Sequence, residues 1–357
     1  MIFDFNDAIL PDLSKPIFII GAGGIVKDAH LPAYKIAGFT VAGIYDHDLT
    51  KAKDVAALFN IPKVFETLAE MLASATIDTI FDVAVPGNVI TSILEQLPEK
   101  VSVLIQKPMG NNIVEANEIL RICKDKQLNA GINFQLRYAP FVMAARKIIN
   151  DGLIGEICGI DIHVNVFTPW HLWSFLFNLT RMEILYHSIH YVDLMRSFLG
   201  NPKTVFAKTV KHPAMQNLAS VKTNIIMDYG DSISANIITN HCHNYGPKNQ
   251  DAFIEITGTK GAIKIKLGLL MDYPKGLPDS FEYIVLEENK SVEWQTIEIN
   301  GSWFPHAFIG SMWQIMQAAN NTTIKPDNTV EDAIFTMACV EAAYQSNEIG
   351  GVKLSEL

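Results

Sequence analysis

A glycine-rich turn near the N-terminus constrains the fold of this chain more than any other feature. Gly21 and Gly23, in the segment GAGG, directly follow a short apolar run at 17–20 and precede an amphipathic stretch. A glycine turn between a buried strand and a helix is the phosphate-binding fingerprint of Rossmann-type dinucleotide folds. The first glycine allows the tight turn, and the second lets a pyrophosphate approach the unpaired N–H groups of the helix N-terminus.

Three positions after this turn refine the prediction. Val26 occupies the third fingerprint position, and its β-branched side chain predicts a helix that lies farther from the sheet than a glycine there allows. Asp46 ends the second predicted strand, where an acidic residue accepts hydrogen bonds from the adenosine ribose. Asp48 adds a second carboxylate, and no arginine stands beside the pair. Because carboxylates repel a 2′-phosphate, the sequence favours NAD over NADP.

The first third of the chain alternates short apolar runs with amphipathic stretches, which is typical of βαβ units around a parallel sheet. Strands are predicted at 16–21, 39–46, 62–65, 76–86, 100–108 and 129–137. Helices are predicted at 25–37, 50–59, 66–74, 87–97 and 111–127. We therefore assign residues 1–131 to an α/β Rossmann domain that binds NAD(P).

The remaining residues, 132–357, have a different rhythm. Helices are predicted at 140–151, 187–199 and 330–346, and strands at 157–167, 204–210, 221–230, 232–241, 251–259, 261–267, 281–288 and 293–299. Many alternating strands with few helices predict an open, mainly antiparallel sheet covered on one face by helices. We expect this α+β domain to bind the substrate and to mediate self-association.

Composition excludes several classes of partner. The chain has 357 residues, which suits two domains, and a formal net charge of −10 with no basic run, so nucleic acid is not an expected partner. The four cysteines form no C-x-x-C pair, which argues against a zinc ribbon or a disulfide framework and suits a reducing compartment. The apolar run at 17–20 is too short for a signal segment or a membrane span. We therefore expect a cytoplasmic protein.

Several motifs in this order carry a family resemblance. After the glycine turn come HLPA at 30–33, Val85-Pro86, Gln106-Lys107-Pro108, INFQLRYAP at 132–140 and HSIHYVDL at 187–194. Together they resemble the glucose-fructose oxidoreductase/inositol dehydrogenase/rhizopine-catabolism (Gfo/Idh/MocA) family. The resemblance implies hydride transfer between a nicotinamide and a sugar or cyclitol carbon. It also implies a homo-oligomer, a dimer or tetramer, formed through the open sheet.

The resemblance implies two residues at the reaction centre. The family's Glu-Lys-Pro lysine matches Lys107, and its substrate-site histidine matches His190. Gln106 replaces the glutamate, which removes a negative charge that favours the ammonium form of the lysine. Tyr186 stands where the family has an aspartate four residues before the histidine, so Tyr186 and His187 become the further candidates for proton transfer. The competing interpretations are an ordinary surface lysine and histidines packed in a core.

The resemblance also suggests ligand-binding positions. The expected cofactor-binding residues are Gly21, Gly23, Gly24, Ile25, Val26, Asp46, Val85, Pro86, Asn88, Gln106, Lys107 and Asn133. The expected substrate-binding residues are Arg137, Trp170, Trp173, Arg181 and His306. Aromatic faces stack on sugar C–H surfaces, and arginine and histidine bind hydroxyl groups, although the tryptophans suit simple packing equally well.

No metal site is expected. His187 and His190 form an H-x-x-H pair, and His241 and His243 share one face of a strand, but neither pair has an evident third ligand. The predicted reaction is deprotonation of a sugar or polyol hydroxyl by His190, assisted by Lys107, with hydride transfer to nicotinamide C4. Two alternatives stay open: a glycosidase or epimerase that oxidises its substrate transiently with retained NAD, and a non-catalytic dinucleotide sensor.

Overall fold

A computed structural model describes residues 2–3, 15–289, 291–321 and 323–351. The chain forms two compact units, and each is described by itself. The five-stranded unit comprises the described residues of 15–140 and 301–337, and the nine-stranded unit those of 2–3, 141–300 and 338–351. The predicted boundary lies between 131 and 132, whereas this division assigns residues 132–140 and a C-terminal segment, 301–337, to the five-stranded unit.

The five-stranded unit contains a fully parallel sheet with the order β3-β2-β4-β5-β6. Its strands are β2 Ile17–Ile20, β3 Val41–Tyr45, β4 Ile80–Val83, β5 Ser102–Ile105 and β6 Asn129–Ile132. Strands β2, β4 and β5 are buried along their whole length, which explains why their sequences are apolar apart from Asp82 and Ser102. The predicted strand at 62–65 contributes only an isolated bridge between Val64 and Ile44.

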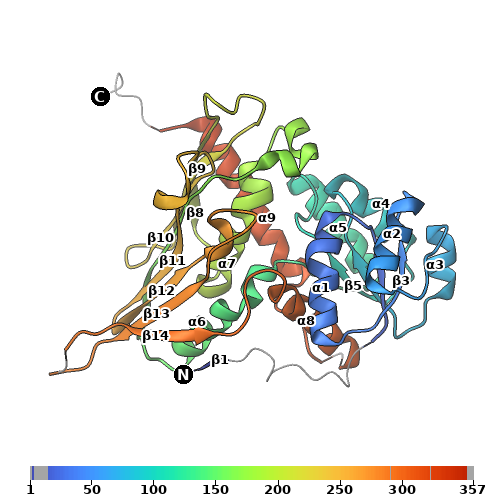
Figure 1. The fold of residues 1–357 in the computed structure, drawn as a ribbon, viewed down its shortest axis with the longest axis horizontal. Helices are drawn as coiled ribbons and strands as arrows, with labels where there is room; N and C mark the ends of the chain where they lie inside the picture. The colour runs from blue at the N-terminus through green and yellow to red at the C-terminus, as the bar shows by residue number, and fades with distance from the viewer. Residues whose placement is uncertain (1, 4–14, 290, 322, 352–357) are drawn as a thin grey trace. The chain divides into compact units, whose positions relative to one another are not determined.

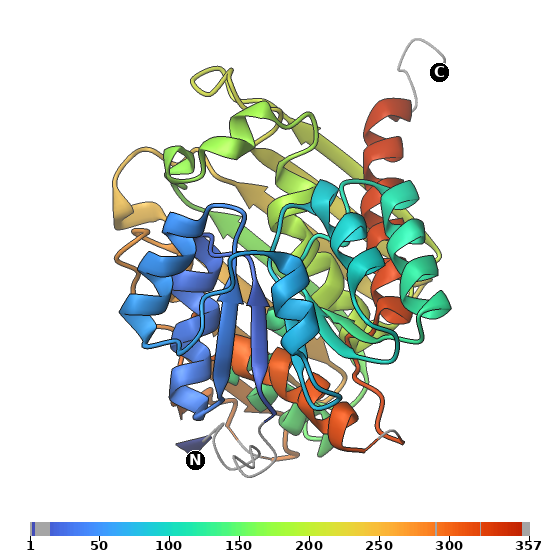
Figure 2. The ribbon, with the colours of Figure 1, turned by 90° about the vertical axis from the view of Figure 1, so that its right-hand side faces the viewer.

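Helices connect and accompany these strands (Figures 1 and 2). They are α1 Leu31–Ala37, α2 Leu49–Phe59, α3 Leu68–Ser74, α4 Ile90–Gln96, α5 Ile113–Asp125 and α8 Ala307–Asn320. Helix α1 is preceded by a π-helical turn, Val26–His30, within the predicted helix 25–37. The sequence did not predict α8, which packs against α1, β5 and β6. Its apolar residues surround the helix axis, so it lacks the one-sided pattern on which prediction depends.

A buried polar group ties the first helical segment to the centre of this sheet. The Asp82 Oδ2 atom lies 2.7 Å from His30 Nδ1 and accepts a hydrogen bond of 2.7 Å from the Tyr34 hydroxyl. The side chains of His30 and Asp82 have no exposed surface. Buried polar groups need such partners, because an unpaired one loses its hydration without compensation.

Replacing Asp82 by leucine is therefore expected to lower the free energy of unfolding by about 3–5 kcal/mol, because two buried donors lose their acceptor. Tyr34→Phe is the matched control and removes one hydrogen bond, worth about 1 kcal/mol. Urea unfolding followed by circular dichroism measures both changes. Equal, small losses in the two variants would contradict the role assigned to this carboxylate.

The nine-stranded unit contains one mixed sheet with the order β1-β14-β13-β12-β11-β7-β10-β9-β8 (Figure 1). Its strands are β1 Ile2–Phe3, β7 Ile157–Asn165, β8 Thr204–Val210, β9 Lys222–Asp228, β10 Ser234–Asn240, β11 Asp251–Gly258, β12 Gly261–Lys266, β13 Ser280–Val285 and β14 Gln295–Ile299. Pairs β1–β14 and β7–β10 are parallel, and the other pairs are antiparallel. The predicted open, mainly antiparallel sheet is confirmed.

Strands β9 and β10 alternate between buried and more exposed residues, as expected for a sheet with one covered face. The helices of this unit are α6 Pro140–Asn150, α7 Ile189–Leu199 and the C-terminal part of α9 Val330–Ile349. Ser346 and Asn347 of α9 accept hydrogen bonds from backbone N–H groups of β8. A π-helical segment, Glu183–Ser188, precedes α7. Among the described residues, no helix is both long and apolar enough to cross a membrane.

Candidate functional site

The carboxyl edge of the five-stranded sheet gathers most of the predicted cofactor residues. Gly21 follows β2, Asp46 follows β3, Val85 and Pro86 lie just beyond β4, and Gln106 follows β5. Strand β2 pairs with β3 on one side and with β4 on the other, so the chain connections diverge at this point. Ligands of doubly wound α/β folds bind at such a switch point, outside the carboxyl ends of the strands.

The glycine turn has the backbone that a phosphate loop requires. Gly21 has a φ of +111°, and a Cβ atom there would lie 2.3 Å from the carbonyl oxygen of Ala84. Gly23 and Gly24 are exposed, and a Cβ atom on Gly23 would meet no atom within 4 Å. The turn is therefore closed on the side of Gly21 and open above Gly23, where a pyrophosphate has room to approach.

Asp46 is held in place beside this turn. Its Oδ2 atom accepts a hydrogen bond of 2.7 Å from the Ala22 N–H, and Oδ1 accepts one of 2.8 Å from the Asp48 N–H. An ionised carboxylate offers about four acceptor positions, so Asp46 keeps capacity for ribose hydroxyls. Asp48 has another task, because its side chain caps α2 by accepting from the N–H groups of Thr50 and Lys51.

The other predicted cofactor positions divide into two groups. Pro86 and Asn88 are exposed, and Ile25 and Val85 are partly buried. Val26, by contrast, is the first residue of the π-helical turn and is fully buried. Val26 therefore contributes its side chain to the protein core, and any ligand contact at this position involves the backbone.

Lys107 lies just beyond β5 and is partly buried, while Gln106 is buried. Burial lowers the pKa of Lys107 to about 8, because the low-dielectric surroundings disfavour the ammonium form. The sequence argument attributed an easier titration of Lys107 to the missing glutamate, whereas the structure supplies burial as the cause. A lysine with this pKa exchanges protons near neutral pH.

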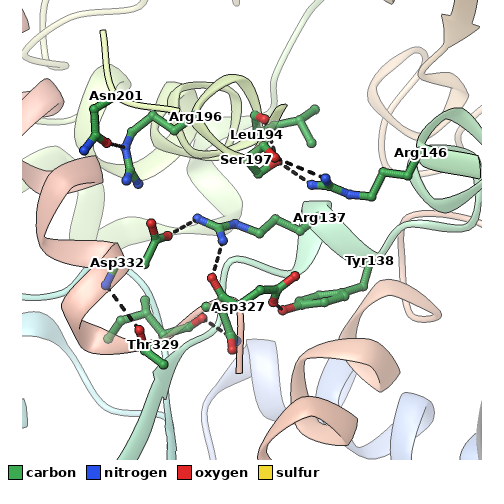
Figure 3. A network of polar contacts seen from close by, with 12 residues as sticks. Arg137, Tyr138, Arg146, Leu194, Arg196, Ser197, Asn201, Asp327, Thr329 and Asp332 are labelled. Atoms are coloured by element: carbon green, nitrogen blue, oxygen red, sulfur yellow. Dashed lines mark hydrogen bonds and ion pairs between the residues drawn. The ribbon is translucent and has the colours of Figure 1, made fainter. Parts of the chain in front are cut away.

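Two predicted ligand residues are engaged inside the five-stranded unit. Asn133 is fully buried, and its Nδ2 atom lies 3.2 Å from His30 Nε2. Arg137 donates to the Asp327 carbonyl at 2.6 Å and pairs with the Asp332 carboxylate at 2.5 Å (Figure 3). These contacts give both residues a place in the interior of the unit, and the cofactor and substrate contacts predicted for them stay predictions.

Within the nine-stranded unit, the structure brings His187 together with two residues from elsewhere. Glu183 lies one turn before His187, and its Oε1 atom is 3.8 Å from His187 Nδ1 and 3.3 Å from His241 Nε2. The two imidazole rings are nearly perpendicular, with centroids 4.2 Å apart. We call Glu183, His187 and His241 the imidazole–carboxylate cluster.

Aromatic residues surround this cluster. Trp170 is buried, and its ring centroid lies 5.0 Å from that of His241 and 6.3 Å from that of Trp173. Tyr186 is half-buried and packs edge-on against Phe175. His190 lies on α7 and is 7% exposed. The chain changes from π-helix to α-helix between His187 and His190.

The remaining predicted substrate residues have structural partners. Arg181 forms two hydrogen bonds to the Glu341 carboxylate, at 2.7 and 3.0 Å, and its guanidinium lies over the Tyr344 ring. His306 accepts a hydrogen bond from the Ser302 N–H at the start of α8, and burial lowers its pKa. Arg181 and His306 thus have partners within the protein, and their substrate contacts stay predictions.

Sequence reasoning missed Glu183 and left His241 without a role. A glutamate four residues before a histidine on a helix faces the same side, so the Glu183–His187 spacing was an available signal. Strand β10 places His241 beside this pair, and only the tertiary fold shows that contact.

Family comparisons cover both units. The model described as "Oxidoreductase family, NAD-binding Rossmann fold" matches residues 15–134, and the one described as "Oxidoreductase family, C-terminal alpha/beta domain" matches residues 146–354. D-apiose dehydrogenase of Rhizobium rhizogenes is 24% identical over 339 residues, covering 92% of this chain and 94% of that protein. Glucose-6-phosphate 3-dehydrogenase of Bacillus subtilis is 25% identical over 276 residues, covering 71% and 75%.

Solved structures show the same fold. An oxidoreductase from Agrobacterium radiobacter, in complex with NAD⁺, L-tartaric acid and magnesium, superposes with a TM-score of 0.78 at 20% identity. That match covers 96% of this chain and 99% of the other. A putative myo-inositol dehydrogenase from Sinorhizobium meliloti gives a TM-score of 0.71 at 20% identity, covering 94% and 98%.

Proposed function

Because this chain belongs to the Gfo/Idh/MocA oxidoreductase family, we propose that it is a dehydrogenase that oxidises a sugar or polyol hydroxyl with NAD. The observation that carries this proposal is the carboxyl edge of the five-stranded sheet, where Gly21 follows β2, Asp46 follows the adjacent β3, and Lys107 lies just beyond β5, with β4 between β2 and β5. The sugar class is supported by relatives named as dehydrogenases of D-apiose and of glucose 6-phosphate.

The chain's own residues suit the binding of a dinucleotide. The exposed Gly23 and Gly24 would receive the pyrophosphate, and Asp46 would accept hydrogen bonds from the ribose. When bound, NAD supplies the hydride acceptor. Lys107, with its lowered pKa, would donate a hydrogen bond to the substrate oxygen and so stabilise the charge that develops when its proton leaves.

His190 is the proposed general base, with Tyr186 and His187 as further proton-transfer candidates. This assignment rests on the family resemblance, since His190 holds the position of the family's substrate-site histidine. Trp170 and Trp173 are the proposed aromatic contacts of the sugar. The product would be a ketone, or a lactone if the oxidised carbon is anomeric.

Asp46 is proposed to set a preference for NAD. Replacing it by serine is expected to lower kcat/KM for NAD at least about tenfold and to raise that for NADP, because the repulsion of a 2′-phosphate is removed. Asp48→Ser is the matched control, which removes the second carboxylate but keeps a side chain that can cap α2, and it should keep the preference. Steady-state kinetics with both cofactors measure the ratio, and an unchanged ratio in Asp46→Ser would refute the assignment.

A homo-oligomer formed through the open face of the nine-stranded sheet is part of the same proposal. Phe206 and Ile226 are cross-strand neighbours on this face and are 57% and 52% exposed. Ile238 on the next strand is 46% exposed. Apolar side chains gathered on one face mark a surface for protein association. We expect Ile226→Lys to reduce the mass measured by sedimentation equilibrium, whereas an unchanged mass would place the contact elsewhere.

The proposed activity is tested by incubating the protein with NAD or NADP and aldoses, uronates, inositols and 1,5-anhydro sugars. Net growth of the reduced-nicotinamide absorbance with one sugar class is the expected result. Cofactor binding without net reduction of any sugar would instead indicate transient oxidation by retained NAD or a dinucleotide sensor. Lys107→Met separates these two alternatives. The replacement should impair transient oxidation of the sugar, whereas it should leave the function of a non-catalytic sensor unchanged.

A further inference from the structure

The imidazole–carboxylate cluster has a property that the proposed dehydrogenase reaction leaves unexplained. Glu183 has no exposed surface, and its Oε1 atom accepts hydrogen bonds from the hydroxyls of Ser188 at 2.7 Å and Thr239 at 2.9 Å. Its Oε1 atom also lies 3.3 Å from His241 Nε2 and 3.8 Å from His187 Nδ1. The cluster is therefore built around a buried carboxylate.

A buried anion needs a cation close by. In the described part of the chain, the ion-pair contacts of Glu183 are with the imidazoles of His187 and His241, and neither an arginine nor a lysine joins them. One imidazole would suffice as the hydrogen-bonded partner of the carboxylate, and here there are two. Two nitrogen donors and one carboxylate are a ligand set that transition-metal ions such as Zn²⁺ favour.

We propose that Glu183, His187 and His241 form a binding site for a divalent transition-metal ion of the Zn²⁺ class. One potential ligand atom from each residue lies within 4.8 Å of the other two. Zinc holds nitrogen and oxygen ligands at about 2.0–2.2 Å, so a small side-chain movement brings all three into range. The expectation of no metal site rested on the lack of a third ligand, and Glu183 supplies that ligand.

The surrounding hydrogen bonds indicate the ligand atom for two of the three residues, Glu183 and His241. Ser188 and Thr239 occupy Glu183 Oε1, whereas Glu183 Oε2 is buried and forms no hydrogen bond with the described residues. Thr168 Oγ1 lies 2.8 Å from His241 Nδ1, which fixes this ring and leaves Nε2 to face the cluster. Partners on the far side of ligating residues are typical of metal sites, where they orient the ligands.

The proposed site would be accessible to an ion and would leave one coordination position without a protein ligand. Its third residue, His187, keeps 16% of its side-chain surface exposed, which provides a route for the ion. Three protein ligands leave a fourth position for water or a substrate oxygen, as in catalytic rather than structural zinc sites. A metal-bound His187 must be neutral and cannot also transfer protons. The inference therefore removes His187 from the proposed proton-transfer candidates and leaves the assignments of His190 and Lys107 unchanged.

The test uses the full chain after treatment with a chelator. Zn²⁺ is titrated by isothermal calorimetry, and Co²⁺ is added separately to read the ligand field from its visible spectrum. The variants are His187→Asn, His241→Asn and Thr168→Val. The matched control is His163→Asn, which alters a histidine on β7 of the same sheet, 35% exposed and 3.9 Å from Asp251.

One ion per chain is expected in the unaltered protein and in His163→Asn. The affinity should fall at least about tenfold in His187→Asn and His241→Asn, and by a similar factor in Thr168→Val. Zn²⁺ should also raise the melting temperature of the unaltered protein but not that of His187→Asn. Because His187 is partly exposed, this variant keeps the test valid if His241→Asn fails to fold.

Two outcomes would overturn the proposal. One is that the unaltered protein binds neither Zn²⁺ nor Co²⁺. The other is that it binds Zn²⁺ with the same affinity as His187→Asn. Either result would leave the cluster as a carboxylate paired with imidazoles alone. Neither depends on whether NAD reduction is observed.

Discussion

Replacing Lys107 with methionine is expected to lower kcat for sugar oxidation by about 10²–10⁴-fold, the range typical of a lost proton-transfer or charge-stabilising group. Methionine keeps an apolar stem of similar length but removes the donor that follows β5. Affinity for NAD, measured by calorimetry, should change little, because the proposed pyrophosphate contacts are at Gly23 and Gly24. An active methionine variant would remove Lys107 from the reaction.

The pH dependence of the unaltered enzyme tests the same residue. Burial lowers the pKa of Lys107 from 10.5 to about 8, so its ammonium form is present below pH 8 and is lost as the pH rises through that value. If the ammonium form stabilises the substrate oxygen, kcat should fall above about pH 8. Lys107→Arg keeps its charge over this range and should lose the falling limb, whatever its absolute rate. A falling limb that persists in Lys107→Arg would assign it to another group.

Replacing Gly21 with alanine is expected to damage both stability and cofactor binding. The residue has a φ of +111°, and a Cβ atom there would lie 2.3 Å from the Ala84 carbonyl oxygen, so the loop must shift. Strain of this kind costs about 1–3 kcal/mol, and we expect at least about a tenfold loss of NAD affinity.

Gly23→Ala separates the two effects. A Cβ atom on Gly23 meets no protein atom within 4 Å, so the melting temperature should be unchanged, yet the methyl group would occupy the space proposed for the pyrophosphate. Thermal unfolding and calorimetric titration with NAD measure both quantities. Normal NAD affinity in Gly23→Ala would show that the pyrophosphate lies elsewhere.

The parallel and antiparallel sheets could be predicted from sequence because their strands carry distinct patterns. Short, mostly apolar runs identify β2, β4 and β5, and the alternation of β8 to β10 identifies a sheet with one covered face. Helix α8 was not predicted because it is buried around its whole circumference. The π-helical turns before α1 and α7 escaped because one extra residue per turn leaves the apolar pattern nearly unchanged.

The candidate site could be proposed from sequence where it depends on local motifs, and the contacts between distant segments could not. The Gly21 turn and Asp46 are recognisable from a strand, a turn and an acid in order. Arg137 has its carboxylate partner at Asp332, and Arg181 has its partner at Glu341, so their charges are balanced by residues far along the chain. Composition and spacing hold no information on such pairs, and a family resemblance does not supply that information.

The central claim is net hydride transfer from a sugar carbon to NAD. We would measure it with a sugar from the responding class, deuterated at its carbinol carbons, and analyse both the released cofactor and the recovered sugar by mass spectrometry. The account predicts that released NADH carries one deuterium and that the oxidised sugar carries one deuterium fewer than the starting sugar. Deuterium that returns to the sugar, with no NADH released, would contradict a dehydrogenase and indicate transient oxidation by retained cofactor.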